Sequence, residues 1–239
     1  MMKAGEANFL VFLKNAEQFS IPIFQRMYSW QKEECQQLWD DIIRTGSNSQ
    51  IQSHFIGSIV YIGGVAKVID PEPFMVIDGQ QRLTTITLLL EALAREIESR
   101  DNIKPITGFT PEAIRNQYLL NLYGYDEHHY KLILTEADKD TLIKIITQRE
   151  ASVSSGSIRI LENFEFFKEK IKTLKGDLVA LCNGLAKLMV VDVALDRTQD
   201  NPQLIFESMN STGRELSQAD LIRNFILMGL TQELQSDLY

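Results

Sequence analysis

One stretch of the chain changes abruptly from apolar to polar and back, and the predicted fold is built around it. An apolar run at 74–77 (Phe-Met-Val-Ile) ends at the polar stretch 78–82 (Asp-Gly-Gln-Gln-Arg). The pattern predicts a buried strand, a tight turn at Gly79 and a helix that continues to about residue 100. The apolar residues of that helix recur with the spacing of one helix face: Leu83, Ile86, Leu89, Leu90, Leu93 and Ile97.

Three further segments have the pattern of strands. Residues 54–62 (HFIGSIVYI) and 189–195 (MVVDVAL) are rich in β-branched and aromatic residues, which favour strands. Residues 21–25 include Pro22, which restricts the residue before it to extended conformations and suits a strand start or an edge. Together with 74–77, these segments predict a small mixed sheet.

Helical spacing of apolar residues recurs along most of the remaining chain. One helix is predicted at 30–43, and the region 103–188 contains helical patterns with little sign of a site. We therefore predict an α+β fold. Residues 1–102 and 189–239 form a mixed-sheet core with packed helices, and residues 103–188 form a largely helical insertion or subdomain. The other helices are expected at 9–19, 137–148, 157–174, 177–188, 203–209 and 218–229, with a helix start at Thr110.

The turn after the strand at 74–77 is a candidate anion site. A helix N-terminus beside a strand end offers unpaired backbone N–H groups, and the helix dipole favours negative charge there. Arg82 adds a planar guanidinium suited to phosphate, each charge-assisted contact contributing about 1.5–3 kcal/mol. Asp78 would repel a phosphate unless a cation lay between them, which points to Mg²⁺. The alternative is an ordinary strand–helix connection with an aspartate cap and a solvent-exposed arginine.

Two further polar clusters could contribute to the same site. Gln25 and Arg26 stand at the end of the predicted strand at 21–25, where polar donors could converge on an anion. The alternative for Arg26 is an ordinary surface charge. Asn210 and Thr212 lie in a polar loop between two predicted helices, and Arg223 lies on the second of these helices. That loop could hydrogen-bond a base, a sugar or a phosphate, or it could simply cap the helices.

Composition changes this interpretation only by excluding classes of protein. The 239 residues are 44% hydrophobic and 23% charged, which is ordinary for a soluble globular protein. A net charge of −8 counts against broad non-specific nucleic-acid binding, which depends on neutralising phosphates. No stretch approaches the roughly 20 apolar residues of a membrane span, and two widely separated cysteines fit a reducing compartment. We therefore expect a cytoplasmic protein that does not act at a membrane.

Four blocks of the sequence resemble the successive motifs of one family. They are IPIFQRMYSW (21–30), FIGSIVYI (55–62), FMVIDGQQRLTTI (74–86) and FESMNSTGRELSQADLIRNF (206–225). The blocks are similar to those of the GmrSD-type family, the DGQQR-motif proteins of bacterial restriction and phage defence. The N-terminal domain of that family is similar in fold to ParB and sulfiredoxin, which bind nucleotides through a GxxR motif. Here that motif reads Gly79-Gln80-Gln81-Arg82.

The resemblance implies a module that binds a nucleoside triphosphate, and in several members hydrolyses it, to regulate or drive cleavage of modified DNA. Carried onto this chain, residues 79–82 would hold the phosphates. Asp78 would assist Mg²⁺ or orient water. The remaining pocket residues would be Gln25, Arg26, Asn210, Thr212 and Arg223.

Family members often continue into a C-terminal nuclease domain of the His-Asn-His type, and this sequence contains no such motif. We therefore expect DNA to be cut by a nuclease domain or partner subunit outside this chain. The alternative function is a non-enzymatic module that reads DNA or a modified base, with the nucleotide as a switch. A third is a direct ParB-like nuclease. Steep salt dependence would indicate DNA reading, and Mg²⁺ dependence would indicate a nucleotide site. The oligomeric state, a homo-oligomer included, stays open.

Overall fold

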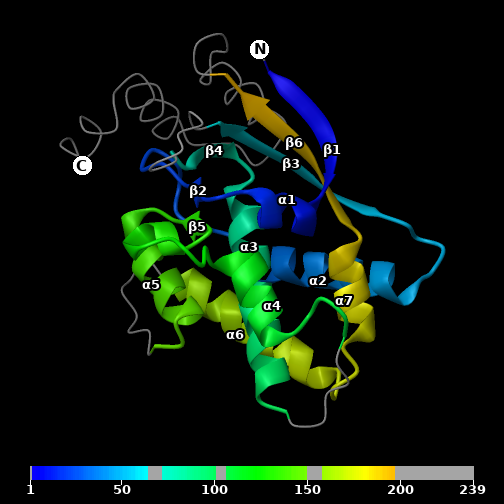
Figure 1. The fold of residues 1–239 in the computed structure, drawn as a ribbon. Coiled ribbons are helices and arrows are strands. Elements are labelled where there is room, and N and C mark those ends of the chain that lie inside the picture. The colour runs from blue at the N-terminus through cyan, green and yellow to red at the C-terminus, as the bar shows by residue number, and fades with distance from the viewer. Residues whose placement is uncertain (1, 64–71, 101–105, 150–157, 197–239) are drawn as a thin grey trace.

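The computed structural model describes residues 2–63, 72–100, 106–149 and 158–196. Within these ranges a mixed β-sheet lies on one side of the molecule, and helices pack against its inner face (Figure 1). The sheet has six strands among the described residues, in the order β1-β6-β3-β4-β2-β5. These strands and helices share one main hydrophobic core, which confirms the predicted α+β fold with a mixed sheet.

The centre of the sheet consists of three strands that the sequence predicted. They are β3 (His54–Ile62), β4 (Phe74–Asp78) and β6 (Leu188–Leu195). β3 pairs with β6 in parallel and with β4 antiparallel. The register of β3 and β4 sets Val60 opposite Asp78, so the middle of β3 runs beside the turn that follows β4. This register positions the candidate site.

The strand predicted at 21–25 is wrong, because the structure instead has β2 at Phe19–Ser20. Pro22 has no N–H to donate to a strand ladder. Gln25 N donates to Pro22 O at 3.0 Å, which closes a turn where the strand was expected. β2 pairs in parallel with β4 and with β5 (Leu132–Ile133), so the sheet continues at this edge through a neighbouring segment.

The other edge of the sheet is β1 (Lys3–Asn8), a strand that the sequence analysis did not predict. Its sequence, KAGEAN, has no alternation of apolar residues, and its first four residues are exposed. β1 pairs with β6 in an antiparallel ladder over its whole length. This segment is a strand because its backbone pairs with β6, and its own residues carry no strand pattern from which that pairing could be predicted.

Most described helices begin and end near the predicted positions. α2 (Lys32–Ser47) was predicted at 30–43. Its start is marked by a capping box, in which Gln31 N donates to Glu34 Oε2 at 2.8 Å. Ser29 and Trp30, just before it, donate their backbone N–H groups to the side chain of Gln81. The remaining α-helices are α1 (Phe9–Asn15), α3 (Gln80–Glu98), α4 (Pro111–Ile114), α5 (Glu136–Ile146), α6 (Ile158–Thr173) and α7 (Val179–Ala186). A short π-helix, η1 (Arg115–Leu119), and a 3-10 helix, η2 (Asp126–His129), follow α4.

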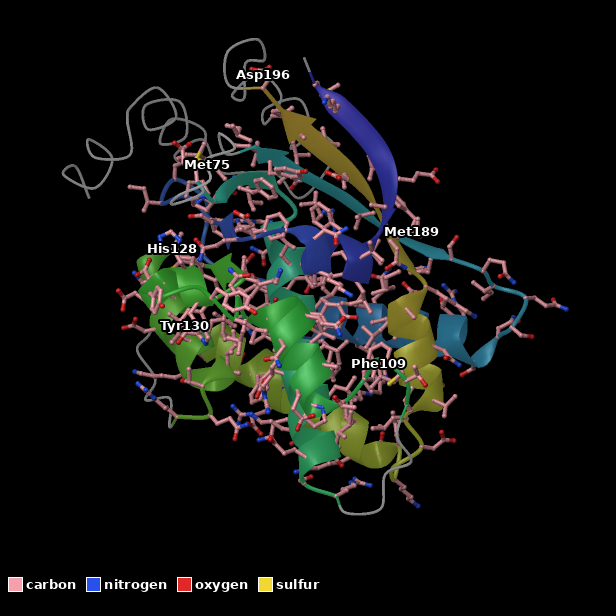
Figure 2. All side chains as sticks on the ribbon, in the orientation of Figure 1. Met75, Phe109, His128, Tyr130, Met189 and Asp196 are labelled. Atoms are coloured by element: carbon pink, nitrogen blue, oxygen red, sulfur yellow. The ribbon has the colours of Figure 1, made fainter. Side chains whose placement is uncertain are left out.

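Side chains on the central strands alternate between the two faces of the sheet. Ile59 and Tyr61 on β3 belong to the main core, which also includes Phe109 among the helices. Val60 belongs to a smaller cluster on the other face, where Met75 packs against it. Figure 2 shows Met75 at the sheet and Phe109 well separated from it among the helices. The site must therefore be sought where helix α3 leaves the sheet, because both faces nearby are packed.

The predicted insertion at 103–188 contributes to both layers of the fold. It supplies β5 to the sheet and α6 and α7 to the main core. α6 packs along α3 and α7 packs along α2, and a Cβ on Gly184 would lie 2.0 Å from Ile42 O. Whether 103–188 is a separate subdomain stays a prediction. None of the described helices is long and apolar enough to span a lipid bilayer.

Candidate functional site

The strand–turn–helix predicted at 74–82 is present, and a glycine makes its turn. Gly79 has a φ of 98°, in the left-handed region, and stands immediately before α3. A Cβ at this position would lie 2.5 Å from Ile59 Cδ1 and 2.9 Å from Ser58 O. Both the dihedral angle and the close approach to β3 therefore require glycine. The start of α3 is pressed against the middle of β3.

Arg82, in the first turn of α3, lies against the backbone of β3. Its Nη1 donates to Ser58 O at 2.7 Å, and its side chain stays 28% exposed. A Cβ on Gly57 would lie 2.7 Å from Arg82 Cζ, and Gly57 has a φ of 110°. Gly57 therefore allows a close approach to the β3 backbone, and the guanidinium of Arg82 is the group that approaches. Asp78 Oδ2 lies 3.9 Å from Arg82 Nη1, a loose pair that contributes at most about 1 kcal/mol.

The first glutamine of the motif ties α3 to the segment that follows β2. Gln80 Nε2 donates to Gln25 Oε1 at 3.1 Å and to Arg26 O at 3.0 Å. Gln25 Nε2 in turn donates to Ile77 O at 2.7 Å. Both glutamine side chains are buried. The structure therefore brings the two sequence blocks together, and the amide groups of Gln25 and Gln80 hold them in place.

The second glutamine holds the approach to α2. Gln81 Oε1 accepts from Ser29 N at 2.9 Å and from Trp30 N at 3.1 Å, and Gln81 Nε2 donates to Met27 O at 3.4 Å. Asn163 on α6 donates to Trp30 O at 2.8 Å. A buried polar group must find partners or cost free energy, and backbone groups of this loop supply them. Direct contacts of the three buried glutamines with a ligand stay a prediction.

Beneath this loop lies a buried polar cluster centred on Tyr28. Its hydroxyl is 2.7 Å from Thr85 Oγ1 and accepts from Asn163 Nδ2 at 2.9 Å. Its backbone N–H donates to Asp138 Oδ2 at 2.7 Å. Burial raises the pKa of Tyr28 well above its ordinary value, and burial also raises the pKa of the Cys35 thiol to about 12. Both groups stay protonated at neutral pH, so the cluster positions the loop and offers no nucleophile.

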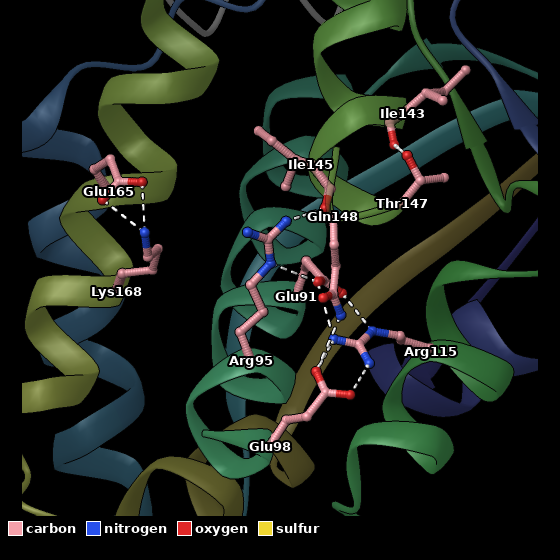
Figure 3. A network of polar contacts seen from close by, with 10 residues as sticks. All are labelled: Glu91, Arg95, Glu98, Arg115, Ile143, Ile145, Thr147, Gln148, Glu165 and Lys168. Carbon is pink, nitrogen blue, oxygen red and sulfur yellow. Dashed lines mark hydrogen bonds and ion pairs between the residues drawn. The ribbon is translucent and has the colours of Figure 1, made fainter. Parts of the chain in front are cut away.

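Helix α3 is fixed on the side away from the sheet by ion pairs around Glu91 (Figure 3). Glu91 is fully buried, and its carboxylate accepts from Arg95 Nε at 2.9 Å and from Arg115 Nε at 3.0 Å. Arg115 also pairs with Glu98 at 2.9 Å, and Arg95 donates to Ile145 O on α5. Burial raises the pKa of Glu91, against the opposing effect of hydrogen bonds from Arg115 and Arg95. The network fastens α3 to two neighbouring elements, η1 through Arg115 and α5 through Ile145.

A pocket of ≈ 380 Å³ opens between α2, β3 and the first turns of α3. Arg82 and Trp30 line it on the side of the motif, and Phe55 lines it from β3. Glu34 and Asp41, seven residues apart on α2, also line it. The volume lies within the range of small-molecule sites. The pocket therefore places aromatic and acidic side chains beside the turn that begins α3.

A family model described as GmrSD restriction endonuclease, N-terminal domain, matches residues 9–227. The chain belongs to this family. The match spans all four resembling blocks, so the resemblance found in the sequence is confirmed. A search of curated proteins finds no match.

Within this GmrSD N-terminal domain, the predicted site residues fall into two groups. Gln25, Arg26 and residues 78–82 come together at the start of α3, as described above. No group of three or more histidine, cysteine, aspartate or glutamate side chains among the described residues could hold a metal ion. The last group lies outside the described residues, as do the helices predicted at 203–209 and 218–229: Asn210, Thr212 and Arg223.

The pocket residues were missed by the sequence analysis. Glu34, Leu38 and Asp41 follow the i, i+4, i+7 spacing of one helix face, and all three line the pocket. The sequence signal that could have indicated this pocket was one apolar residue between two acidic residues on the same face of the predicted helix. Phe55, at the start of β3, is 59% exposed in the structure. In the sequence it looks like any other aromatic residue of a strand, so its place in the pocket could not be predicted.

Proposed function

We propose that this GmrSD N-terminal domain is a nucleoside-triphosphate-binding module of a modification-dependent restriction or defence system, and that it slowly hydrolyses the bound nucleotide. The proposal rests on Arg82. Its guanidinium is held against Ser58 O at 2.7 Å, in the first turn of a helix that follows a strand end. A fixed cation beside a helix N-terminus is a ready site for phosphate, because little has to be reorganised when the anion binds.

The surroundings of Arg82 support phosphate binding in a second way. The guanidinium has five N–H donors, and Ser58 O accepts from one of them. The buried amides of Gln80 and Gln81 hold the 25–30 segment against the helix start. Arg26 is part of that segment and can add a second positive charge.

Asp78 fits the expected role toward Mg²⁺. Its carboxylate is 32% exposed at the end of β4, beside Arg82. Mg²⁺ is usually bound through one or two carboxylates together with substrate phosphates and water, so a single aspartate suits a metal that arrives with the nucleotide. A bound Mg²⁺ would neutralise charge on the phosphates. Asp78 would also orient the attacking water, and Arg82 would stabilise the charge that develops on the transferred phosphoryl group.

The first test compares Arg82→Ala with the unaltered chain by thermal shift and by phosphate release, using each nucleoside triphosphate with and without Mg²⁺. A ligand at about 100 times its dissociation constant should stabilise the native protein by about 2.7 kcal/mol. We expect this shift in the unaltered chain and its loss in Arg82→Ala. Arg159→Ala, which removes an exposed arginine on α6, is the matched control and should keep the shift.

Unchanged nucleotide affinity in Arg82→Ala would overturn the assignment of this site. If no nucleotide shifts the melting temperature of the unaltered chain, the proposed function fails. DNA binding that falls steeply with salt would then favour a DNA- or modified-base-recognition module. The net charge of −8 counts against broad DNA binding by this chain and so favours the nucleotide over the DNA alternative. DNA would be bound through a nuclease domain or partner subunit.

A further inference from the structure

The pocket beside Arg82 has two chemically different ends. Arg82 supplies a positive charge at the end formed by the start of α3, whereas Glu34 and Asp41 supply carboxylates along α2. Leu38, Ile56 and Ile86 line the space between them. A ligand that complements this pocket would therefore present a negative charge to Arg82, and hydrogen-bond donors or a positive charge to Glu34 and Asp41.

The aromatic side chains are arranged to receive a flat, neutral group. Phe55 lines the pocket and is 59% exposed. Trp30 lines the same pocket, and its backbone is fixed by hydrogen bonds to Gln81 Oε1 and from Asn163 Nδ2. Rings of this kind stack on any nucleobase, because every base has a π-face.

The two carboxylates decide which half of a nucleotide can enter. A triphosphate carries several negative charges and would be repelled by Glu34 and Asp41. A nucleoside carries no charge, and its hydroxyl and amino groups are donors for carboxylate oxygens, which can only accept. Asp41 is also 3.5 Å from His54 Nε2, and Glu34 caps α2 through Gln31 N at 2.8 Å, so both acids have defined positions.

We infer that this pocket is the nucleoside subsite, and that the phosphates lie on the other side of Arg82 at the start of α3. The inference rests on the proposed function and adds an orientation to it. Arg82 then stands at the junction of the two subsites. Phe55 stacks on the base, and the carboxylates of Asp41 and Glu34 accept hydrogen bonds from the nucleoside.

The test compares two probes, a nucleoside triphosphate and inorganic tripolyphosphate, each with Mg²⁺ and titrated calorimetrically against the same variants. Phe55→Ala should weaken nucleoside triphosphate binding about tenfold, within the range for loss of one base–aromatic stack. It should leave tripolyphosphate affinity unchanged. Asp41→Asn should also weaken the nucleotide, whereas tripolyphosphate should bind equally well or more tightly, because a negative charge has been removed.

Matched controls separate these effects from general damage. Leu122→Ala removes an apolar side chain that is 58% exposed outside the pocket, and Asp40→Asn removes a neighbouring charge that does not line it. Neither should change the affinity for either probe. Loss of both probes in Arg82→Ala completes the expected pattern.

Three outcomes would overturn the inference. If Phe55→Ala and Asp41→Asn leave nucleotide affinity unchanged while both probes bind, the pocket is not the nucleoside subsite and the phosphate site stands. If these variants weaken both probes equally, the pocket holds phosphates. If neither probe binds to the unaltered chain, the proposed function fails and this orientation fails with it.

Discussion

The contact between Gly57 and Arg82 is the smallest unit on which the site depends. Arg82 can lie on β3 only because position 57 has no side chain. A methyl group there would have to displace the guanidinium or the strand. Gly57 therefore acts through Arg82, and it is a positioning residue with no expected contact to a ligand.

Gly57→Ala tests this role. The substitution combines a positive φ with a Cβ 2.7 Å from Arg82 Cζ, so we expect a loss of unfolding free energy of about 1–3 kcal/mol together with weakened nucleotide and tripolyphosphate binding. Urea unfolding and calorimetric titration measure the two effects. Gly5→Ala on β1, where a Cβ would meet nothing within 4 Å, should lower neither the unfolding free energy nor the affinity. A folded Gly57→Ala variant with full affinity would contradict the role assigned to this contact.

Individual residues also show how far the sequence could lead. The turn at Gly79, the arginine at 82 and the meeting of the segments 21–30 and 78–82 followed from local pattern and from the family resemblance. The sequence did not reveal that Gln80 and Gln81 bind backbone groups of the 25–30 segment. A glutamine in a motif looks the same in sequence whether its amide contacts a ligand or the backbone. Only the positions of Arg26, Met27 and Ser29 in space reveal the difference.

At the scale of elements, helix α3 is the part to which the rest is fastened. One end meets the sheet, and its middle carries Glu91 with Arg95 and Arg115. Glu91 is fully buried, whereas the Glu98 side chain in the same network is 47% exposed. Two carboxylates that contact the same arginine therefore differ in their exposure to water, which predicts different energetic roles.

Glu91→Gln and Glu98→Gln form a matched pair of tests. Removing the Glu91 charge leaves two arginine side chains without their buried partner, which typically costs about 3–5 kcal/mol of unfolding free energy. The exposed Glu98 charge should contribute at most about 1 kcal/mol. Chemical denaturation of both variants checks this. Equal losses would mean that Glu91 is not the centre of the network.

Acid should abolish the small contribution of Glu98. A hydrogen bond from Arg115 lowers the pKa of Glu98 below its ordinary value of 4.5. A carboxyl group with a lowered folded-state pKa stabilises the protein above its unfolded-state pKa, and this stabilisation is lost as the pH falls through the folded-state pKa. The difference in stability between the unaltered chain and Glu98→Gln should therefore be present at pH 7 and vanish in acid. A difference that persisted in acid would contradict the ion-pair origin.

The whole molecule combines parts that the sequence predicted well with parts that depend on distant partners. The central strands at 54–62 and 74–77 are locally apolar and were predictable. β1 and β2 were not, because KAGEAN pairs only as a neighbour of β6, and Pro22 moves the short parallel strand to 19–20. The pocket could not be derived, because it exists only where α2, β3 and α3 converge.

The division at 103–188 can be tested on the whole molecule. Asn163 on α6 donates to Tyr28 and Trp30, so the predicted insertion is tied to the loop beside the site. We expect a single unfolding transition in urea, with the fluorescence of Trp30 and Trp39 and the circular dichroism of all helices changing together. Separate transitions would instead support an independent helical subdomain.

The reliance of Arg82 on a missing side chain at position 57 has a consequence for how this fold can vary. The two positions belong to different elements, yet neither can change alone without cost. In a relative that lacks the arginine, position 57 would no longer need to be glycine, and a residue with a side chain could occupy it. The two positions should therefore covary across an alignment, and a bulky residue at position 57 would mark a member that lacks the proposed phosphate site.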